Sequence, residues 1–342
     1  MTIGVNYGIM AFGHTLGKAI PIEQCLPVAP SVRRRLKSWG YRNFHRAEDG
    51  IGLTDLAVEA GASALQHAEI ASTDVDFMVL AISDIAEYLY WDPASAVQGR
   101  LGASRAEAIL ISQACASGVM SFDAAAGKLA THADYRIGLI IAANRVCETY
   151  WDRADTNTAM NSDGAAAAVV IRDFPHRRWL TTDTITDGRY ADFFRLEAGG
   201  TANPFSAIID GIDKVENQFE RVRRFFGSDV QAALAFGESA RERTVDVLRR
   251  ACGRAGVRPA DLSFIIYMND NIASMTNLAQ ALDITVEQTN ADLAMKHGHL
   301  GAADQIYCLE KYIASGRLSC GDIVALIGIS SGMHWVCTLL RI

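Results

Sequence analysis

The chain alternates two hydrophobic patterns along its length. Short, nearly continuous apolar runs, of which 77–82 and 165–171 are the clearest, are typical of strands that helices cover on both faces. Between such runs lie longer stretches with helical periodicity, rich in Ala and other apolar residues, at 54–68, 119–133 and 239–253. Because buried strands and helices alternate, the pattern predicts an α/β fold.

The pattern of the first half returns in the second half. A helical stretch leads into an apolar run that starts at Phe77, and another leads into a run that starts at Phe264, an offset of 264 − 77 = 187 residues. The run that starts at Ile137 is matched by one that starts at Ile323, an offset of 323 − 137 = 186. Such close agreement indicates an internal duplication. Residues 188–236 lie between the paired units, lack clear periodicity and are interpreted as an insertion over a site.

The composition is that of a compact globular protein. The chain has 342 residues, 50% of them hydrophobic, which suffices for about two core-forming units. Its 32 Lys and Arg residues against 39 Asp and Glu residues give a net charge of −7. A protein that binds nucleic acid by bulk electrostatics needs an excess of positive charge, so no nucleic-acid partner is expected.

Several features predict a cytoplasmic protein. The apolar runs are far shorter than the ~20 residues that span a bilayer, so no membrane association is expected. No basic residue precedes Lys18, so the start of the chain lacks the charged segment of a secretory signal. The seven cysteines are odd in number and never spaced as CxxC, which indicates reduced thiols.

One cysteine has the sequence surroundings of a nucleophile. The apolar run 109–111 breaks into small residues around Cys115, and the helical stretch 119–133 follows. The start of a helix stabilises a thiolate through its unpaired N–H groups and dipole, and small neighbours let an acyl group approach. The alternative is a cysteine that packs as a small hydrophobe in the core.

The duplication predicts where a catalytic partner lies. Adding 186 to 115 gives 301, which falls in the segment Lys-His-Gly-His at 296–299 and the small residues after it. If equivalent helix starts meet, His299 or His297 lies near Cys115, and Cys with His is the minimum for an activated thiol. The alternatives are a solvated loop or half of a metal site with Asp304, for which no further ligand lies at the required spacing.

The sequence resembles the thiolase superfamily, and most closely β-ketoacyl-acyl-carrier-protein synthase III and its relatives. The resemblance implies a five-layered αβαβα sandwich of two duplicated halves, usually a homodimer, with the halves at 1–174 and 175–342. The first half carries the Cys nucleophile and the second carries the His loop and the insertion. The matching segments are Ser38–Arg42, Asp76–Phe77, the Cys115 segment, Asp163–Ala166, Gly298–Ala303 and Ser331–Trp335.

Two departures from the family pattern change the chemistry that the resemblance implies. The condensing members use a Cys, a His and an Asn; Cys115 matches the first, but Met268 stands in place of the His and His299 in place of the Asn. A thioether donates no hydrogen bond to a developing enolate, and loss of such a donor costs about 10²–10³ in rate. His299 is instead a base that can accept a proton from an alcohol or amine.

The resemblance assigns the remaining roles. The backbone N–H of Ser331 pairs with that of Cys115 to hold an oxyanion, and Asn269 or Asn271 orients His299 or the acceptor. No cofactor is expected to stay bound, and no metal; the donor is an acyl thioester.

The family's coenzyme A-binding Trp and Arg are not recognisable at 33–38, so either acyl carrier protein or coenzyme A is expected to deliver the acyl group. Two basic groups are expected either to form solvated faces or to dock an acidic carrier. They are Arg33–Arg35, and Arg221, Arg223 and Arg224.

These features predict a ping-pong acyltransferase that moves an acyl group through Cys115 to a hydroxyl or amine of a small natural-product acceptor such as a sugar, with His299 as base. The alternatives are a decarboxylative β-ketoacyl synthase, which forms carbon–carbon bonds, and a non-catalytic partner subunit of a ketosynthase heterodimer. Segments rich in Tyr, Trp and Phe at 83–91 and 188–226 are expected to line the pocket.

Overall fold

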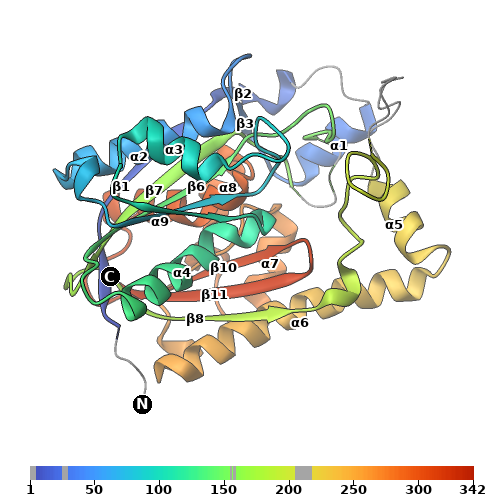
Figure 1. Cartoon of the computed structure of the whole chain (residues 1–342). Coiled ribbons are helices and arrows are strands. Elements are labelled where there is room, and N and C mark those ends of the chain that lie inside the picture. Colours follow the sequence, from blue (N-terminus) through green and yellow to red (C-terminus); the bar gives the residue numbers. More distant parts are fainter. Residues whose placement is uncertain (1–4, 25–29, 155, 157–158, 205–217) are drawn as a thin grey trace.

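The computed structural model describes residues 5–24, 30–154, 156, 159–204 and 218–342 (Figure 1). In the first half of the chain the structure has β1 (Tyr7–Leu16), β2 (Lys18–Pro21), α1 (Pro30–Ser38), β3 (Asn43–Arg46), α2 (Leu53–Ala68), β4 (Phe77–Ile82), α3 (Pro93–Leu101), β5 (Glu107–Ile111), α4 (Ser117–Thr131), β6 (Ile137–Asn144) and β7 (Gly164–Arg172). The second half has β8 (Arg178–Thr186), α5 (Gln218–Phe226), α6 (Val230–Ala255), β9 (Phe264–Ile266), α7 (Ile272–Ala281), α8 (Ala291–His297), α9 (Asp304–Ala314), β10 (Ile323–Ser330) and β11 (His334–Arg341).

The large strands form a mixed sheet with the order β5-β4-β6-β7-β1-β8-β11-β10-β9 among the described residues. The sheet has two halves, because β1 and β8 are paired in register at one position, Gly8 with Arg178. In Figure 1 the half that contains β1 and β7 lies above the half that contains β8 and β11.

The two sheet halves have the same topology. β4 and β6 pair in parallel, as do β9 and β10. β7 is antiparallel to both β6 and β1, and β11 is antiparallel to both β10 and β8. The helices that follow the predicted Cys and His loops, α4 and α9, start 304 − 117 = 187 residues apart. The predicted duplication is therefore confirmed.

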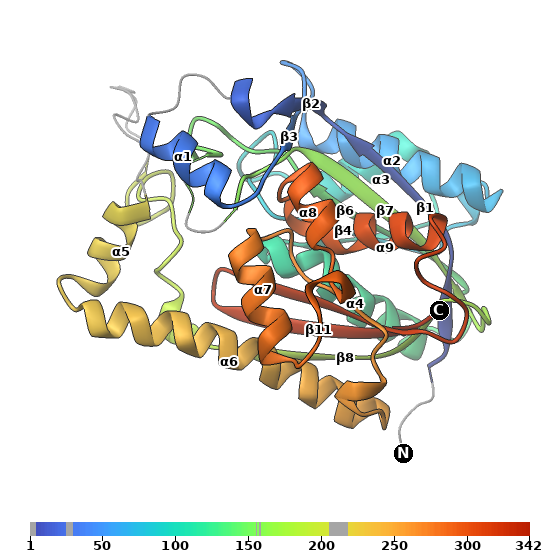
Figure 2. The same cartoon turned by 180° about the vertical axis from the view of Figure 1, so that it is seen from behind.

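Helices form three layers around the two sheet halves (Figures 1 and 2). Side chains of α4 and α9 lie in the central core, which also takes side chains from both sheet halves. Side chains of α2 and α3 share a second core with the outer face of the first sheet half, and those of α6, α7 and α8 share a third with the second half. The α/β class and the predicted αβαβα sandwich are confirmed.

Strand β4 shows why the run 77–82 is apolar throughout. Because successive side chains of a strand point to opposite faces, a strand between two helical layers needs apolar residues at every position. Phe77, Val79 and Ala81 belong to the central core, and Met78, Leu80 and Ile82 belong to the outer core.

Helix α6 begins earlier than the hydrophobic pattern predicts. The pattern indicates a helix at 239–253, whereas α6 spans 26 residues from Val230. Its first turns are exposed, with Val230 66% and Leu234 59% accessible, so they carry no amphipathic signal.

Across the described parts of the chain, α6 included, no helix has the combination of length and apolar character that crossing a membrane requires.

The central layer depends on a close contact between the starts of its two helices. A Cβ atom on Gly118, the second residue of α4, would lie 2.0 Å from the carbonyl oxygen of Ala302, just before α9. That distance is far below van der Waals contact, and the obstacle is backbone, which cannot rotate away. The approach of the two helix starts therefore requires glycine at this position.

We expect Gly118→Ala to destabilise the fold by about 1–3 kcal/mol, as overpacking of a closed site does. Gly127→Ala on the same helix is the matched control, because a Cβ there meets nothing within 4 Å. That change should stabilise the protein by about 0.5–1 kcal/mol, since alanine favours the helix. Urea unfolding of both variants measures the difference, and equal free energies of unfolding would contradict the proposed contact.

Candidate active site

A strained turn between β5 and α4 presents Cys115. The residue lies in a short 3₁₀ segment, Ala114–Ala116, directly before α4. Ala114 has φ 49°, a left-handed conformation that costs energy for a residue with a Cβ. The turn is held by Ser117, whose hydroxyl accepts from the N–H of Gln113 at 2.7 Å and donates to the carbonyl of Ile82 at 3.0 Å. The predicted position of Cys115 at a helix start is confirmed.

Backbone hydrogen bonds hold His299 in the equivalent turn of the second half. The residue lies between α8 and a 3₁₀ segment, Gly301–Ala303, that precedes α9. Its N–H donates to the carbonyl of Met160 at 2.7 Å, and its carbonyl accepts from the N–H of Ser162 at 2.7 Å. This short parallel bridge to the first half fixes the backbone from which the imidazole projects.

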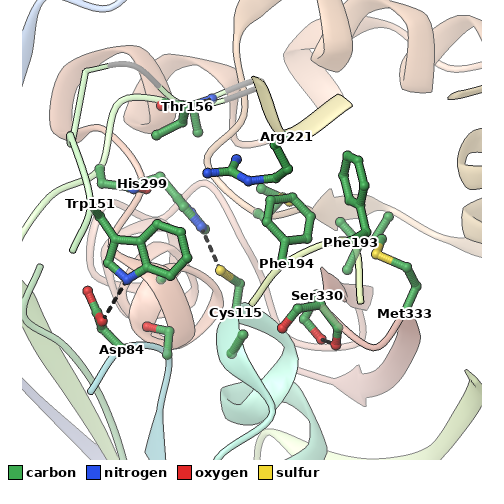
Figure 3. A pocket seen from close by; sticks show the side chains of 18 of the residues that line it. Asp84, Cys115, Trp151, Thr156, Phe193, Phe194, Arg221, His299, Ser330 and Met333 are labelled. Carbon is green, nitrogen blue, oxygen red and sulfur yellow. Dashed lines mark hydrogen bonds between the residues drawn. The ribbon is translucent and has the colours of Figure 1, made fainter. Parts of the chain in front are cut away.

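Cys115, His299 and Asp304 form a continuous hydrogen-bonded chain. The Cys115 Sγ atom lies 3.0 Å from His299 Nε2, and His299 Nδ1 lies 2.5 Å from Asp304 Oδ2. Figure 3 shows the His299 ring directed at the sulfur, with a dashed line between them. The predicted proximity of Cys115 and His299 is confirmed. A nucleophile, a base and a group that orients the base are thus in place.

The Asp304 carboxylate is fixed from several sides. The residue is completely buried at the start of α9. Besides the His299 ring, it accepts hydrogen bonds from the backbone N–H of Asn269 at 2.6 Å and of Leu300 at 2.7 Å. These donors hold both carboxylate oxygens in a fixed position beside the imidazole.

Neither Asn269 nor Asn271 binds the His299 ring, and the alternative role that was expected for them, binding the acceptor, stays a prediction. Both ring nitrogens are taken, one by Asp304 and one by Cys115. The Asn269 side chain instead donates to the carbonyl of Gly298 at 2.8 Å, and the Asn271 side chain caps α7 by accepting from the N–H of Ser274. The Asp304 carboxylate is the better partner for His299 Nδ1, because a carboxylate binds an imidazolium more strongly than a neutral amide does.

The surroundings favour the charged form of His299. Burial by itself lowers the pKa of the imidazole, but the Asp304 carboxylate and Cys115 outweigh it, so the pKa of His299 lies well above its ordinary value. An imidazolium at this place donates from Nε2 to the sulfur and from Nδ1 to the carboxylate. A cation beside a thiol favours its reactive thiolate form, so this arrangement suits a nucleophile.

His297 takes no part in this chain. Its Nδ1 lies 3.0 Å from Nε2 of His45, and its Nε2 lies 3.2 Å from the hydroxyl of Tyr307. His45 Nδ1 in turn lies 2.8 Å from the carbonyl of Gly17. Because that carbonyl needs a donor, the tautomers follow: each His carries its proton on Nδ1, and Tyr307 donates to His297. Of the two histidines that the repeat places near Cys115, the structure selects His299.

A large pocket opens in front of the Cys115–His299 pair. Its volume is about 1850 Å³, more than a small acyl group fills. Both predicted lining segments contribute, the first from Ser83 to Trp91 and the second through described residues between Phe193 and Phe226. Met268 and Ser331 line the same pocket, Met268 at the end of the β9 strand and Ser331 directly after β10.

The two predicted basic groups differ in accessibility. On α1, Arg34 is exposed, and Arg35 donates to the carbonyl of Ala154 at 3.1 Å. On α5, Arg223 is exposed, but Arg221 is 4% accessible and lies in the pocket, so it cannot form part of an external docking surface. Helical periodicity explains this difference, because Arg221 and Arg223 point to different sides of α5.

Sequence reasoning missed the role of Asp304. The residue was weighed only as a possible metal ligand, although it is the acidic residue nearest to His299 and opens a helical stretch. It also missed Trp151, which together with Asp84 from the predicted segment 83–91 forms another part of the pocket wall: the Trp151 indole N–H donates to Asp84 at 3.2 Å (Figure 3). Burial raises the pKa of the Asp84 carboxyl, against three hydrogen bonds that lower it.

Comparisons with known proteins agree with this fold. Residues 111–188 match the family profile described as 3-oxoacyl-[acyl-carrier-protein (ACP)] synthase III, and residues 252–342 match its C-terminal profile. A β-ketoacyl-[acyl-carrier-protein] synthase III of Dinoroseobacter shibae is 27% identical over 347 residues, which covers 99% of this chain and 100% of the relative.

Solved structures share the fold over almost the whole chain. One is named ChlB3 and described as an acyltransferase; it has a TM-score of 0.83 at 21% identity, with 98% of each chain covered. Another is the 3-oxoacyl-[acyl-carrier-protein] synthase III of Aquifex aeolicus, with a TM-score of 0.77 at 22% identity, and 98% of this chain and 100% of the other covered.

Replacing Asp304 tests the electrostatic chain. In Asp304→Asn the pKa of His299 should fall, because its carboxylate partner is lost, so the imidazolium beside the Cys115 sulfur should become scarcer at neutral pH. Each pKa unit corresponds to about a tenfold change, so alkylation of Cys115 by iodoacetamide at pH 7 should slow at least about tenfold. Peptide mass spectrometry separates Cys115 from the exposed Cys320.

The matched control is Asp292→Asn, which removes a partly exposed carboxylate that binds Tyr312 and Arg317 instead. It should leave Cys115 alkylation unchanged. Equal alkylation rates in wild type and Asp304→Asn would show that Asp304 does not govern the pair.

The His45–His297–Tyr307 chain predicts a pH dependence of stability. Burial lowers the pKa of His297 to about 3, and the pKa of His45 is also lowered. The unfolded chain binds more protons than the folded one between about pH 6.5 and pH 3, so stability falls as the pH falls through that window. In His297→Gln this loss should be smaller.

The comparison is the difference in unfolding free energy between His297→Gln and wild type, measured by urea at pH 8 and pH 5. The difference should move in favour of the variant at pH 5. The exposed His176, changed to Gln, should show no such trend. A difference independent of pH would mean that His297 is not held neutral.

Proposed function

This chain is a synthase III-like member of the thiolase superfamily, an enzyme family, and from that premise we propose that it is a ping-pong acyltransferase. Cys115 takes the acyl group from a thioester, and His299 activates the hydroxyl or amine that removes it. The single observation that supports this proposal most is the chain from Cys115 through His299 to Asp304.

The first half-reaction loads the enzyme. The Cys115 thiolate attacks the carbonyl carbon of the donor thioester and forms a new C–S bond. The tetrahedral intermediate then expels the donor's sulfur, which takes the proton from the His299 imidazolium and leaves as a thiol. The products are acyl-Cys115 and a neutral His299, whose Nδ1–H still donates to Asp304.

The second half-reaction needs a base, and neutral His299 supplies it. Its Nε2 accepts the proton of the acceptor's hydroxyl or amine as that oxygen or nitrogen attacks the acyl carbon. The bond to Cys115 breaks, the thiolate returns, and the imidazolium forms again beside it. The elevated pKa of His299 favours this proton transfer and restores the resting ion pair.

The negative oxygen that forms in both steps requires donors. The backbone N–H groups of Cys115 and Ser331 are the proposed pair, as the family resemblance implies, and both residues line the pocket. The N-terminal end of α4, two residues beyond Cys115, adds a favourable dipole.

Carbon–carbon condensation is the second candidate, and the family's own synthases favour it. Their reaction requires stabilisation of a donor enolate. Here Met268 stands where a second donor would be needed, and His299 Nε2 is already directed at Cys115. These residues support transfer to oxygen or nitrogen over decarboxylation.

We propose an acyl carrier protein as the donor, with coenzyme A as the alternative, and a homodimer as the assembled form. Exposed cations on α1 and α5, Arg34, Lys37 and Arg223, are the basic surface available to an acidic carrier. Both helices contact the segment around Trp151 and Ala154, at the pocket.

Separate replacements of Cys115 and His299 test the proposal. Wild type mixed with carrier-bound or N-acetylcysteamine acyl thioesters should gain the mass of one acyl group, and Cys115→Ala should gain none. His299→Ala should still accept the acyl group, more slowly, but release it to a hydroxyl or amine acceptor about 10²–10⁴ times more slowly, the usual contribution of a general base.

Cys320→Ala is the control, because Cys320 is an exposed free thiol outside the pocket, and its adduct should equal that of wild type. An undiminished adduct in Cys115→Ala would overturn the proposal. Cys115-dependent release of CO₂ from a malonyl thioester would favour condensation, and a protein that accepts acyl groups only with a second subunit would favour the partner-subunit alternative.

A further inference from the structure

A buried arginine shares the pocket with Cys115 and His299. Arg221 belongs to α5, is 4% accessible and lines the pocket. Figure 3 shows its side chain entering from the α5 side, with the guanidinium directed toward the part of the pocket where His299 lies. A cation is thus built into the space that the reacting groups occupy.

Aromatic rings hold this cation in place. The guanidinium carbon of Arg221 lies 5.6 Å from the centre of the Trp151 ring and 5.1 Å from that of Phe194. Cation–π contacts at these distances are favourable, and a planar guanidinium packs readily against aromatic rings. Its N–H donors lie in the plane and point outward from its edge.

The Trp151 wall is itself anchored. The indole N–H donates to Asp84, whose carboxylate also accepts from the N–H groups of Ile85 at 2.7 Å and Cys147 at 3.0 Å. The ring that orients Arg221 is therefore tied to the loop after β4 and to the segment after β6. A guanidinium fixed in this way loses little conformational entropy when it binds a ligand.

We propose that Arg221 binds a carboxylate on the substrate, through paired hydrogen bonds from the guanidinium edge to the two carboxylate oxygens. The planar fork of arginine matches a carboxylate, and the buried setting strengthens the charge-assisted hydrogen bonds. The inference rests on the proposed function, since the groups that enter this pocket are then the acyl unit and its acceptor. Either of them can carry the carboxylate.

The rate at which Cys115 is acylated tests whether the acyl unit carries the carboxylate. Succinyl-N-acetylcysteamine and its terminal amide have the same size and differ in charge. If the acyl unit carries the carboxylate, wild type should form the succinyl adduct on Cys115 faster than the amide adduct. Arg221→Met should slow succinyl loading roughly ten- to hundredfold, the range of a charge-assisted hydrogen bond, and leave amide loading within about twofold.

The rate of transfer from acylated Cys115 tests whether the acceptor carries the carboxylate. Wild type and Arg221→Met, each carrying an acetyl group on Cys115, are mixed with hydroxy acids or with the corresponding primary amides. If the acceptor carries the carboxylate, wild type should transfer faster to the acids and Arg221→Met should lose that preference. A carboxylate preference that depends on Arg221 in either arm supports the proposal and identifies the source.

The matched control is Arg249→Met, an exposed arginine on α6 that does not line the pocket. It should keep the carboxylate preference of wild type. Arg221→Lys retains the positive charge but loses the fork, so it should recover part of the loss, and it also serves if Arg221→Met does not fold, as judged by circular dichroism.

Calorimetry separates failure of this inference from failure of the proposed function. Free succinate should bind Cys115→Ala at least about tenfold more tightly than it binds the double variant Cys115→Ala/Arg221→Met. This measurement needs no acyl transfer, so it decides the role of Arg221 even if Cys115 is never acylated. Equal binding, together with no Arg221-dependent preference in either kinetic arm, would overturn the inference.

Discussion

The close approach of two helix starts is the constraint on which the rest of the structure depends. Gly118 at the start of α4 leaves room for the Ala302 carbonyl before α9, and each turn carries one reactive residue. Because the turns are equivalent parts of a duplicated chain, their contact brings Cys115 and His299 to 3.0 Å. A similar limit acts on Gly301, where a Cβ would lie 2.0 Å from the Ser83 hydroxyl. The central layer thus aligns the reactive pair through close contacts with backbone at Gly118 and with side chains at Gly301.

Charges and hydrogen bonds fix the orientation of the residues that the packing brings together. Buried charges are costly unless other charges or donors compensate them. Asp304 is compensated by two backbone N–H groups and the His299 ring, and that ring is compensated by Asp304 and the sulfur. Cys115 and His299 are therefore placed to exchange one proton, while the Asp304 carboxylate holds the imidazole in position. Two residues earlier, His297 is buried beside another histidine and a tyrosine, and its lowered pKa keeps it neutral. The pKa values of the two neighbouring imidazoles are therefore shifted in opposite directions.

The pocket combines residues from both duplicated halves and from the segment between them. The strand end after β9 carries Met268, which donates no hydrogen bond, while the loop before α9 carries a base. The segment between the two duplicated halves adds α5 and several aromatic rings to the pocket wall. The resulting pocket has a volume of about 1850 Å³, and the buried Arg221 lines it together with Cys115 and His299. The proposed transfer depends on both properties, space for a second substrate and a fixed charge beside the reactive pair.

The sequence by itself determined the α/β class, the duplication and the placement of Cys115 near a histidine, either His297 or His299. These depend on hydrophobic periodicity and on the spacing of equivalent segments, which are written locally along the chain. Periodicity failed where solvent rather than core surrounds a helix, as at the exposed first turns of α6.

Only the tertiary structure decided the partners of these residues. Asp304 is fixed by the backbone of Asn269, 35 residues away, and the rings around Arg221 come from segments 70 and 27 positions distant (221 − 151 = 70 and 221 − 194 = 27). The sequence does not show which of several polar neighbours reaches an imidazole, or whether an arginine on a helix faces water or a pocket. Hydrogen-bond partners and burial are set by how distant segments pack together, and that packing exists only in the folded chain.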